Sequence, residues 1–176
     1  SLIEALVESP MLKGNQKTIA INITQDSILD TGFHSWLGVF LIGQPNQSRF
    51  YFEVQENTIL SYPEQSQQFV NLVKKMGAKV SIDHYGREMG SLAYLQTIKP
   101  DYVKLDQSLS CNISNEMEVG ELAQRLILTR AVINTALGLG VEVIITGVED
   151  YQQLDRVNGL YATGYQGFII PPSDLY

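Results

Sequence analysis

The sequence predicts a parallel α/β fold, a TIM-like (β/α) barrel with fewer units than a complete one. Strand-length apolar stretches alternate with stretches of helical periodicity along the chain, which implies parallel strands joined by right-handed crossovers. No glycine-rich phosphate turn follows any of the strands, and this favours a barrel over a doubly wound nucleotide-binding sheet. A complete barrel takes about 250 residues. Because the chain has 176, we expect one or two units to be missing.

The composition indicates an ordinary globular domain, with 44% hydrophobic and 18% charged residues. The net charge of −7 and the absence of a dense Lys/Arg run argue against a direct nucleic-acid footprint. Cys111 is the only cysteine, which excludes an internal disulfide and a cysteine metal cage. No apolar stretch approaches the roughly 20 residues that span a bilayer, so a membrane anchor would have to lie outside this segment.

The first expected units cover the N-terminal third of the chain. Residues 1–9 have helical composition and are closed by Pro10. Residues 18–23 are a short apolar strand, and residues 27–42 return to helical spacing before a turn rich in Gly, Pro and Asn. Residues 49–55 alternate and are rich in β-forming side chains, which predicts the second strand.

The next helix has the clearest end signals in the sequence. Ser61 and Glu64 have the spacing of a capping box, Pro63 falls in the first turn, and Gly77 follows the last turn. The apolar run at residues 79–83 then predicts the third strand.

Three more strands are expected in the second half, each accompanied by a helix. The expected strands are residues 101–106, 141–145 and 160–162, and the expected helices are residues 91–97, 119–137 and 151–158.

Polar side chains gather at the carboxyl ends of these strands, where the βα loops of parallel folds converge. The candidate site residues are Asn22, Glu53, Asp83, His84, Lys104, Asp106, Thr146, Glu149 and Gln166. Oxygen ligands that converge at this edge could hold Mg²⁺ or Mn²⁺, and a loop cap or a solvated surface group is the alternative role for each residue. Glu53 and Lys104 favour a site, because apolar residues flank both and a charge in an apolar strand needs a partner or a role.

At these residues the chain resembles the EAL domain family, which comprises bacterial cyclic-di-GMP phosphodiesterases and their inactive relatives. Six segments resemble family motifs in order and at family-like spacing. They are AINIT at 20–24 (V-N-L-S), FEVQE at 52–56 (E-I/L-T-E), IDHYG at 82–86 (D-D-F-G), VKLD at 103–106 (L-K-I-D), GVE at 147–149 (E-G-V-E-T) and QGF at 166–168 (Q-G-Y/F).

The resemblance implies a modified TIM barrel and a set of site positions. Active members hydrolyse cyclic-di-GMP with two divalent ions, a lysine and a glutamate base that activates water. On this resemblance Asn22, Glu53 and Asp83 fall on metal-ligand positions, and Lys104 falls on the catalytic lysine. The positions that match substrate-binding residues are Asp106, Glu149 and Gln166.

Departures from the family pattern predict a catalytically inactive domain. His84 stands where the family has a second aspartate, and losing a carboxylate should weaken the second ion of a two-metal site. Thr146 stands at the general-base position, and threonine is no base near neutral pH, whereas positioned acid–base groups contribute roughly 10² to 10⁴-fold in rate. Residues 87–90 also replace the T-G-Y-S segment that links the family's metal site to its dimer interface.

The tripeptide Glu4-Ala5-Leu6 spells the family's signature, but we interpret it as coincidental. It lies in an expected helix shortly before Asn22, whereas the family signature lies on the first barrel strand, one helix earlier. We therefore expect residues 1–176 to be a single degenerate EAL domain, the C-terminal part of the barrel (about three quarters of it), without the signature strand.

The resemblance leaves three functions open. Thr-Gly-Val at 146–148 and the turn at 162–167 resemble the CsrD-like and MshH-like subgroup. This implies an inactive regulatory domain that acts through protein–protein interaction in small regulatory RNA turnover. The alternatives are a non-hydrolysing cyclic-di-GMP receptor and an active phosphodiesterase.

The same resemblance implies partners and a location. The expected partner is a regulatory protein, EIIA-glucose in the CsrD-like case, and cyclic-di-GMP and a second copy of the chain are further candidates. We expect no required cofactor, with Mg or Mn bound only if the vestigial site still binds. We also expect a cytoplasmic domain of a larger, membrane-anchored bacterial protein.

Overall fold

Six parallel strands form one sheet in the computed structural model, which describes residues 18–88, 93–110 and 119–169. The strands are β1 Ile19–Ile23, β2 Phe50–Gln55, β3 Lys79–Tyr85, β4 Tyr102–Leu105, β5 Glu142–Thr146 and β6 Gly164–Gln166. Each strand pairs with the next one along the chain. The sheet is therefore wound in one direction, as in a barrel, and not outward from its middle as in a doubly wound fold.

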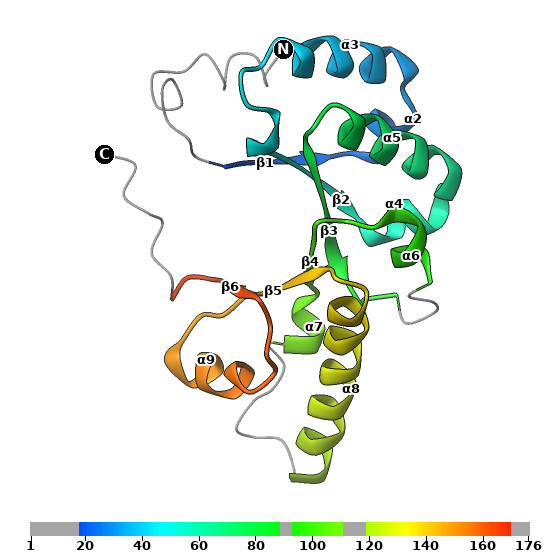
Figure 1. Ribbon diagram of the computed structural model, residues 1–176. Helices are drawn as coiled ribbons and strands as arrows, with labels where there is room; N and C mark the ends of the chain where they lie inside the picture. Colours follow the sequence, from blue (N-terminus) through cyan, green and yellow to red (C-terminus); the bar gives the residue numbers. More distant parts are fainter. Residues whose placement is uncertain (1–17, 89–92, 111–118, 170–176) are drawn as a thin grey trace.

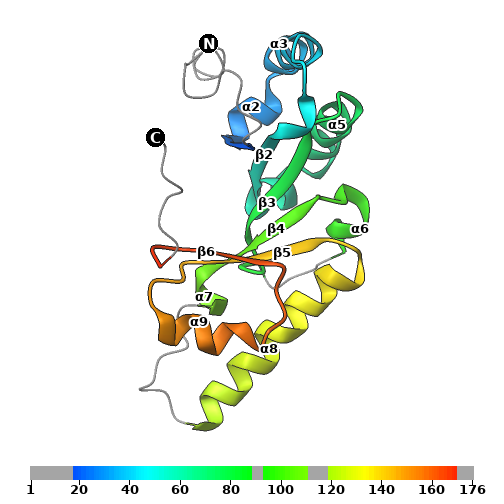
Figure 2. The ribbon, with the colours of Figure 1, turned by 60° about the vertical axis from the view of Figure 1, so that its left-hand side comes forward.

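Helices follow the strands and pack against one face of the curved sheet (Figures 1 and 2). They are α2 Gln25–Leu29, α3 Thr31–Ile42, α4 Glu56–Ser61, α5 Pro63–Lys75, α6 Tyr94–Ile98, α7 Gln107–Ser110, α8 Val119–Gly138 and α9 Tyr151–Asn158, with a 3₁₀ turn at Gln47–Arg49. Among the described residues no helix has the length and apolarity to cross a bilayer. The parallel α/β prediction is confirmed.

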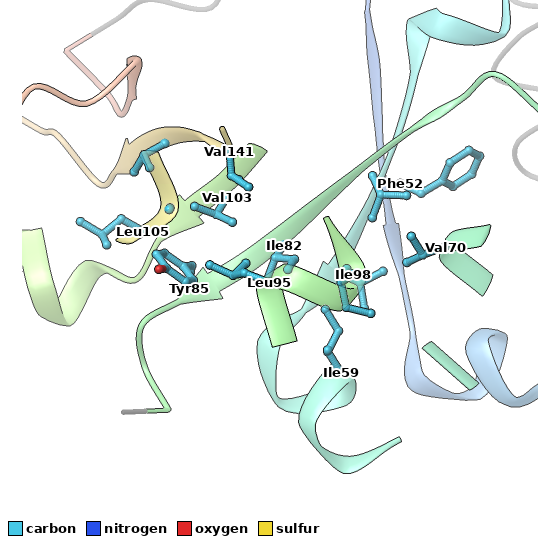
Figure 3. Packing of buried hydrophobic residues seen from close by; sticks show 14 of the residues in the cluster. Phe52, Ile59, Val70, Ile82, Tyr85, Leu95, Ile98, Val103, Leu105 and Val141 are labelled. Atoms are coloured by element: carbon cyan, nitrogen blue, oxygen red, sulfur yellow. The ribbon is translucent and has the colours of Figure 1, made fainter. Parts of the chain in front are cut away.

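The core lies between the sheet and these helices. Alternation along the strands turns Phe52, Ile82 and Val103 toward the helices, and all three are fully buried. Figure 3 shows Phe52 near Val70 of α5, and Val103 near Leu105 and Val141. Burying a side chain of this size stabilises the fold by about 1.5–3 kcal/mol, so this layer holds the strands in place.

The opposite face of the sheet is polar, although barrel interiors are usually filled by branched apolar side chains. Tyr51 and Tyr102 pack with ring centroids 5.1 Å apart, and Lys79 Nζ donates to the Tyr51 hydroxyl at 2.7 Å. That hydrogen bond is the main cause that raises the pKa of Lys79. The polar face continues to the carboxyl edge of the sheet, where the candidate site lies.

The single helix expected over residues 27–42 is wrong. The chain turns at Asp30, whose carboxylate accepts hydrogen bonds from the backbone N–H groups of Gly32 and Phe33. This caps α3 and separates it from α2, which begins earlier, after Thr24. A cap residue in the middle of an apolar pattern therefore outweighed the helical periodicity.

The capping box expected at Ser61 is also wrong. Ser61 is the last residue of α4, a helix that the sequence reading did not predict. The following helix, α5, starts at Pro63, and its N-cap residue Tyr62 makes no side-chain cap bond. The C-terminal end is as predicted, with Gly77 in the left-handed region (φ 84°).

The strand expected at residues 160–162 lies elsewhere, at β6. Leu160 is buried where α9 ends, and Tyr161 has φ 59°, which an extended strand does not allow. Thr163 then joins the sheet, because its N–H donates to the Val143 carbonyl at 2.8 Å.

Several expectations fall on parts of the chain outside the described residues. They are the helix at residues 1–9 with Glu4-Ala5-Leu6, the second half of the segment at 87–90, the start of the helix at 91–97, and Cys111. The short helix α7 was not predicted.

Candidate functional site

A β-bulge places two candidate residues opposite one. Ile82 pairs with Val103 and Tyr85 pairs with Leu105, so β3 has one residue more than β4 between these two pairs. Asp83 and His84 therefore share the space opposite Lys104. His84 adopts φ 59°, a left-handed conformation that is uncommon among non-glycine residues and in which His, with Asn and Asp, is enriched. The bulge brings Asp83 and His84 to the same edge of the sheet.

Glu53 is the most enclosed carboxylate of the candidate set, with 4% of its surface exposed. Its Oε2 accepts a hydrogen bond from Lys104 Nζ at 2.7 Å, and its Oε1 accepts one from the Tyr102 hydroxyl at 2.7 Å. Burial raises the pKa of Tyr102 well above its ordinary value, and the bond to Glu53 adds to the rise. The hydroxyl thus stays a donor, and both oxygens of Glu53 are engaged.

His84 lies between two aspartates. Its Nδ1 is 2.9 Å from Oδ2 of Asp106, and its Nε2 is 3.7 Å from Oδ2 of Asp83. The backbone N–H of His84 also donates to Oδ1 of Asp83 at 3.0 Å. The imidazole therefore occupies the space between the carboxylates of Asp83 and Asp106.

Asp106 is held in its ionised form by its hydrogen bonds. Burial acts to raise its pKa, but the side-chain and backbone hydrogen bonds of Ser108 and the His84 contact outweigh burial, so the pKa is lowered. The Ser108 N–H donates to Oδ1 at 2.9 Å. The loop after β4 is thereby fixed against the loop after β3.

Thr146 ends β5, and its hydroxyl donates to the Leu105 carbonyl at 2.8 Å. Gln166 lies opposite Thr146 in the β5–β6 register and is exposed. The side chain of Glu149 is also exposed, in the loop that β6 holds through the bond from Val148 N–H to the Gln166 carbonyl (3.2 Å). These three positions form the β5–β6 side of the edge.

Asn22 lies on the other side of the site. It faces Glu53 in the β1–β2 register, and both residues line a cavity of about 260 Å³. His84 lines a different cavity of about 210 Å³, together with Glu56 and Arg87. The structure thus brings together Glu53 with Lys104, and Asp83 with His84 and Asp106, while Asn22, Glu149 and Gln166 lie toward the rim.

Sequence reasoning missed two residues of this edge. Glu56 is 1% exposed and accepts hydrogen bonds from Gly86 N–H (3.2 Å), Glu88 N–H (2.9 Å) and the Tyr94 hydroxyl (2.6 Å), so it anchors the loop after β3. Tyr102 is the other. It precedes Lys104 by two positions, so strand alternation already placed it on the same face. Glu56 is the last residue of the FEVQE segment that resembles E-I/L-T-E, so that resemblance was the signal that could have found it.

A pair of divalent ions does not fit the carboxylates as they are arranged. Both oxygens of Glu53 accept hydrogen bonds, and His84 fills the space between Asp83 and Asp106. Within the described parts of the chain no group of three or more His, Cys, Asp or Glu side chains is placed to hold a metal ion.

Comparison with known proteins gives a consistent set of relatives. A model of the family described as EAL domain matches residues 2–173. Escherichia coli PdeG, a probable cyclic di-GMP phosphodiesterase, is 28% identical over 66% of this chain and 22% of its own length. The RNase E specificity factor CsrD of the same species is 22% identical over 86% of this chain and 23% of its own length.

Among solved structures, Vibrio cholerae LapD S helix-GGDEF-EAL bound to c-di-GMP is 30% identical with a TM-score of 0.83. The match covers 96% of this chain and 40% of that one. The chain thus spans less than half of that solved LapD chain and under a quarter of the two curated relatives. The TIM-like barrel that the sequence predicted is the fold of these structural neighbours.

Proposed function

Because the chain belongs to the EAL domain family, we propose that it is a regulatory domain of cyclic-di-GMP signalling that does not hydrolyse the dinucleotide. It acts by contact with a protein partner, as part of a longer protein. The family as a whole belongs to cyclic-di-GMP signalling and generally uses Mg or Mn. The proposal concerns this chain's departure from that activity.

The observation that carries the proposal is Thr146. The resemblance puts the general base of active members at this position, and a threonine hydroxyl does not accept a proton near neutral pH. Here the hydroxyl donates to the Leu105 carbonyl at 2.8 Å, which turns its proton toward the backbone. A water molecule at this edge would have no base in that position.

His84 supports the same proposal. A two-metal hydrolase holds ions about 3.5–4 Å apart between carboxylate and water oxygens. At the second aspartate position this chain supplies an imidazole, hydrogen-bonded to Asp106 at 2.9 Å. On this proposal four residues still match family site positions but serve no turnover: Lys104, Asp106, Glu149 and Gln166. The metal-ligand positions Asn22, Glu53 and Asp83 are vestigial.

The likeness to CsrD supports a protein partner. CsrD, named as a specificity factor for RNase E, is similar to 86% of this chain. By analogy we propose a regulatory protein as partner, with EIIA-glucose as the candidate to try first. We also propose that the parent protein is membrane-anchored with this domain in the cytoplasm.

Turnover of cyclic-di-GMP tests the proposal directly. The protein carrying the full chain is incubated with cyclic-di-GMP and Mn²⁺ or Mg²⁺, and the linear product is measured against an active family member. We expect no product above the protein-free blank. Metal-dependent hydrolysis that Lys104→Met abolishes would contradict the proposal, because it would show chemistry at this site.

A second candidate, a non-hydrolysing cyclic-di-GMP receptor, is favoured by one observation. The 30% identical LapD structure holds c-di-GMP, and this chain retains Glu149 and Gln166 at the β5–β6 side of the edge. Calorimetry with cyclic-di-GMP separates the two candidates. Saturable heat that Gln166→Ala weakens supports the receptor, and no heat at high micromolar concentration removes it.

A further inference from the structure

We propose that His84 keeps divalent metal ions out of this edge by bridging Asp83 and Asp106, so that the site holds its shape without a metal. This inference deepens the proposed function, and it rests on that proposal in taking Asp83 as a vestigial ligand position. His84 stands at a position where the sequence departs from the family pattern.

The first step is the engagement of the carboxylate oxygens around His84. Oδ1 of Asp83 accepts the His84 N–H at 3.0 Å, and Oδ2 of Asp83 lies 3.7 Å from Nε2. Oδ2 of Asp106 lies 2.9 Å from Nδ1, and Oδ1 accepts the Ser108 N–H at 2.9 Å. Three of the four oxygens thus have a hydrogen-bond partner in the protein and the fourth faces the imidazole, so a metal ion that bridges the two aspartates must displace the ring.

The second step is the fixed position of the ring. The bulge in β3 sets the backbone of His84 at φ 59°. The backbone N–H of Asp106, just after β4, donates to the Tyr85 carbonyl of β3 at 2.9 Å. The imidazole and the carboxylate that it meets are therefore held by one piece of sheet. A turn of the His84 side chain about its own torsions would break the contact with Asp106, so this contact is what keeps the ring in place.

The neighbouring carboxylate, Glu53, is also engaged by protein groups. Lys104 and Tyr102 engage both oxygens of Glu53, which is 4% exposed. Glu53 is thus not free to compensate for the carboxylates that His84 contacts. The imidazole is the element whose removal should open the site.

The backbone conformation makes the decisive substitutions practical. Asp and Asn are the non-glycine residues that best tolerate the left-handed region, so His84→Asp and His84→Asn should both keep the bulge. His84→Asn removes the imidazole without adding charge. His84→Asp removes the imidazole and adds a carboxylate oxygen, which Mn²⁺ prefers as a ligand.

The test measures binding of Mn²⁺ alone, by the loss of the free-ion signal in electron paramagnetic resonance. The samples are the protein carrying the full chain and the two His84 variants, each checked for folding by circular dichroism. We expect both variants to bind Mn²⁺ more tightly than the wild type. For His84→Asp we expect the dissociation constant to be lower than that of the wild type by about tenfold or more, equivalent to about 1.4 kcal/mol.

Asn57→Asp is the matched control, because Asn57 is exposed and lines both cavities, so this change adds a negative charge at the same edge and leaves the imidazole in place. We expect it to bind Mn²⁺ like the wild type. Equal gains in Mn²⁺ affinity in Asn57→Asp and His84→Asp would overturn the inference. A His84 variant, whether Asp or Asn, that binds Mn²⁺ no more tightly than the wild type would overturn it as well. Tight Mn²⁺ binding by the wild type without turnover would overturn it too, yet leave the proposed function standing, whereas hydrolysis would remove the proposed function.

Discussion

Tyr102 fixes the position of the buried Glu53 carboxylate, on which Lys104 in turn depends. Its hydroxyl and the Lys104 ammonium each donate to one oxygen of Glu53 at 2.7 Å. A buried carboxylate that loses a donor carries the desolvation cost of an unsatisfied oxygen. The Glu53–Lys104 pair is therefore expected to be sensitive to loss of the Tyr102 hydroxyl.

We predict that Tyr102→Phe lowers the free energy of unfolding by about 1.5–3 kcal/mol, the range for a hydrogen bond to a charged group. Urea denaturation at neutral pH measures the change. Tyr161→Phe is the matched control, because Tyr161 is 79% exposed and its change should stay within about 0.5 kcal/mol. If Tyr102→Phe is as stable as this control, Glu53 does not depend on the hydroxyl.

Residue types at the carboxyl edge could be predicted from the sequence, but their partners could not. The edge position of Glu53 and Lys104 follows from strand alternation and from the shared direction of parallel strands. The bond between them joins residues 51 positions apart, and it depends on the register of β2, β3 and β4. The bulge that places Asp83 beside His84 depends equally on β4, because it exists only relative to a partner strand.

At the level of elements, β6 is held by a close approach of backbones at Gly167. A Cβ atom at Gly167 would overlap the backbone carbonyl group of Val148. The same approach carries two hydrogen bonds, from Val148 N–H to the Gln166 carbonyl (3.2 Å) and from Ile169 N–H to the Val148 carbonyl (3.3 Å). The loop with Glu149 and the strand with Gln166 are therefore one unit.

We predict that Gly167→Ala separates these two segments and destabilises the fold by about 1–3 kcal/mol, as overpacking does. Thermal or urea unfolding measures the loss, and Gly159→Ala serves as the control, because a Cβ at Gly159 meets no atom within 4 Å. Equal stability of the two variants would show that the loop can move aside without cost.

The sequence reading missed two short helices and one helix break. α4 and α7 have six and four residues, and their apolar side chains pack against other parts of the chain, whereas the break at Asp30 is set by a local cap. Thr58 and Ile59 of α4 are buried, and Leu109 of α7 packs where a Cβ at Gly86 would clash. Periodicity over a long window finds α5 and α8, whereas a helix of four to six residues has too few turns to show a period.

For the whole molecule, the singly wound order of strands implies graded stability across the sheet. β3 and β4 have neighbours on both sides, and their residues Ile82 and Val103 are fully buried. Within the described residues β6 pairs with β5 alone, and it is three residues long with no fully buried residue. Local opening requires fewer broken contacts where a strand has one neighbour and a partly exposed surface.

We therefore predict that amide hydrogen exchange is slowest in β3 and β4 and fastest, among the strands, in β6. Mass spectrometry of exchanged and digested protein measures this, and peptides covering residues 79–85 and 164–166 give the comparison. The order follows from opening free energies, which rise from near zero at exposed segments to the global value in the core. Equal protection of β6 and β4 would mean that the β6 edge is covered in solution, because pairing with β5 alone cannot raise its protection to that of a central strand.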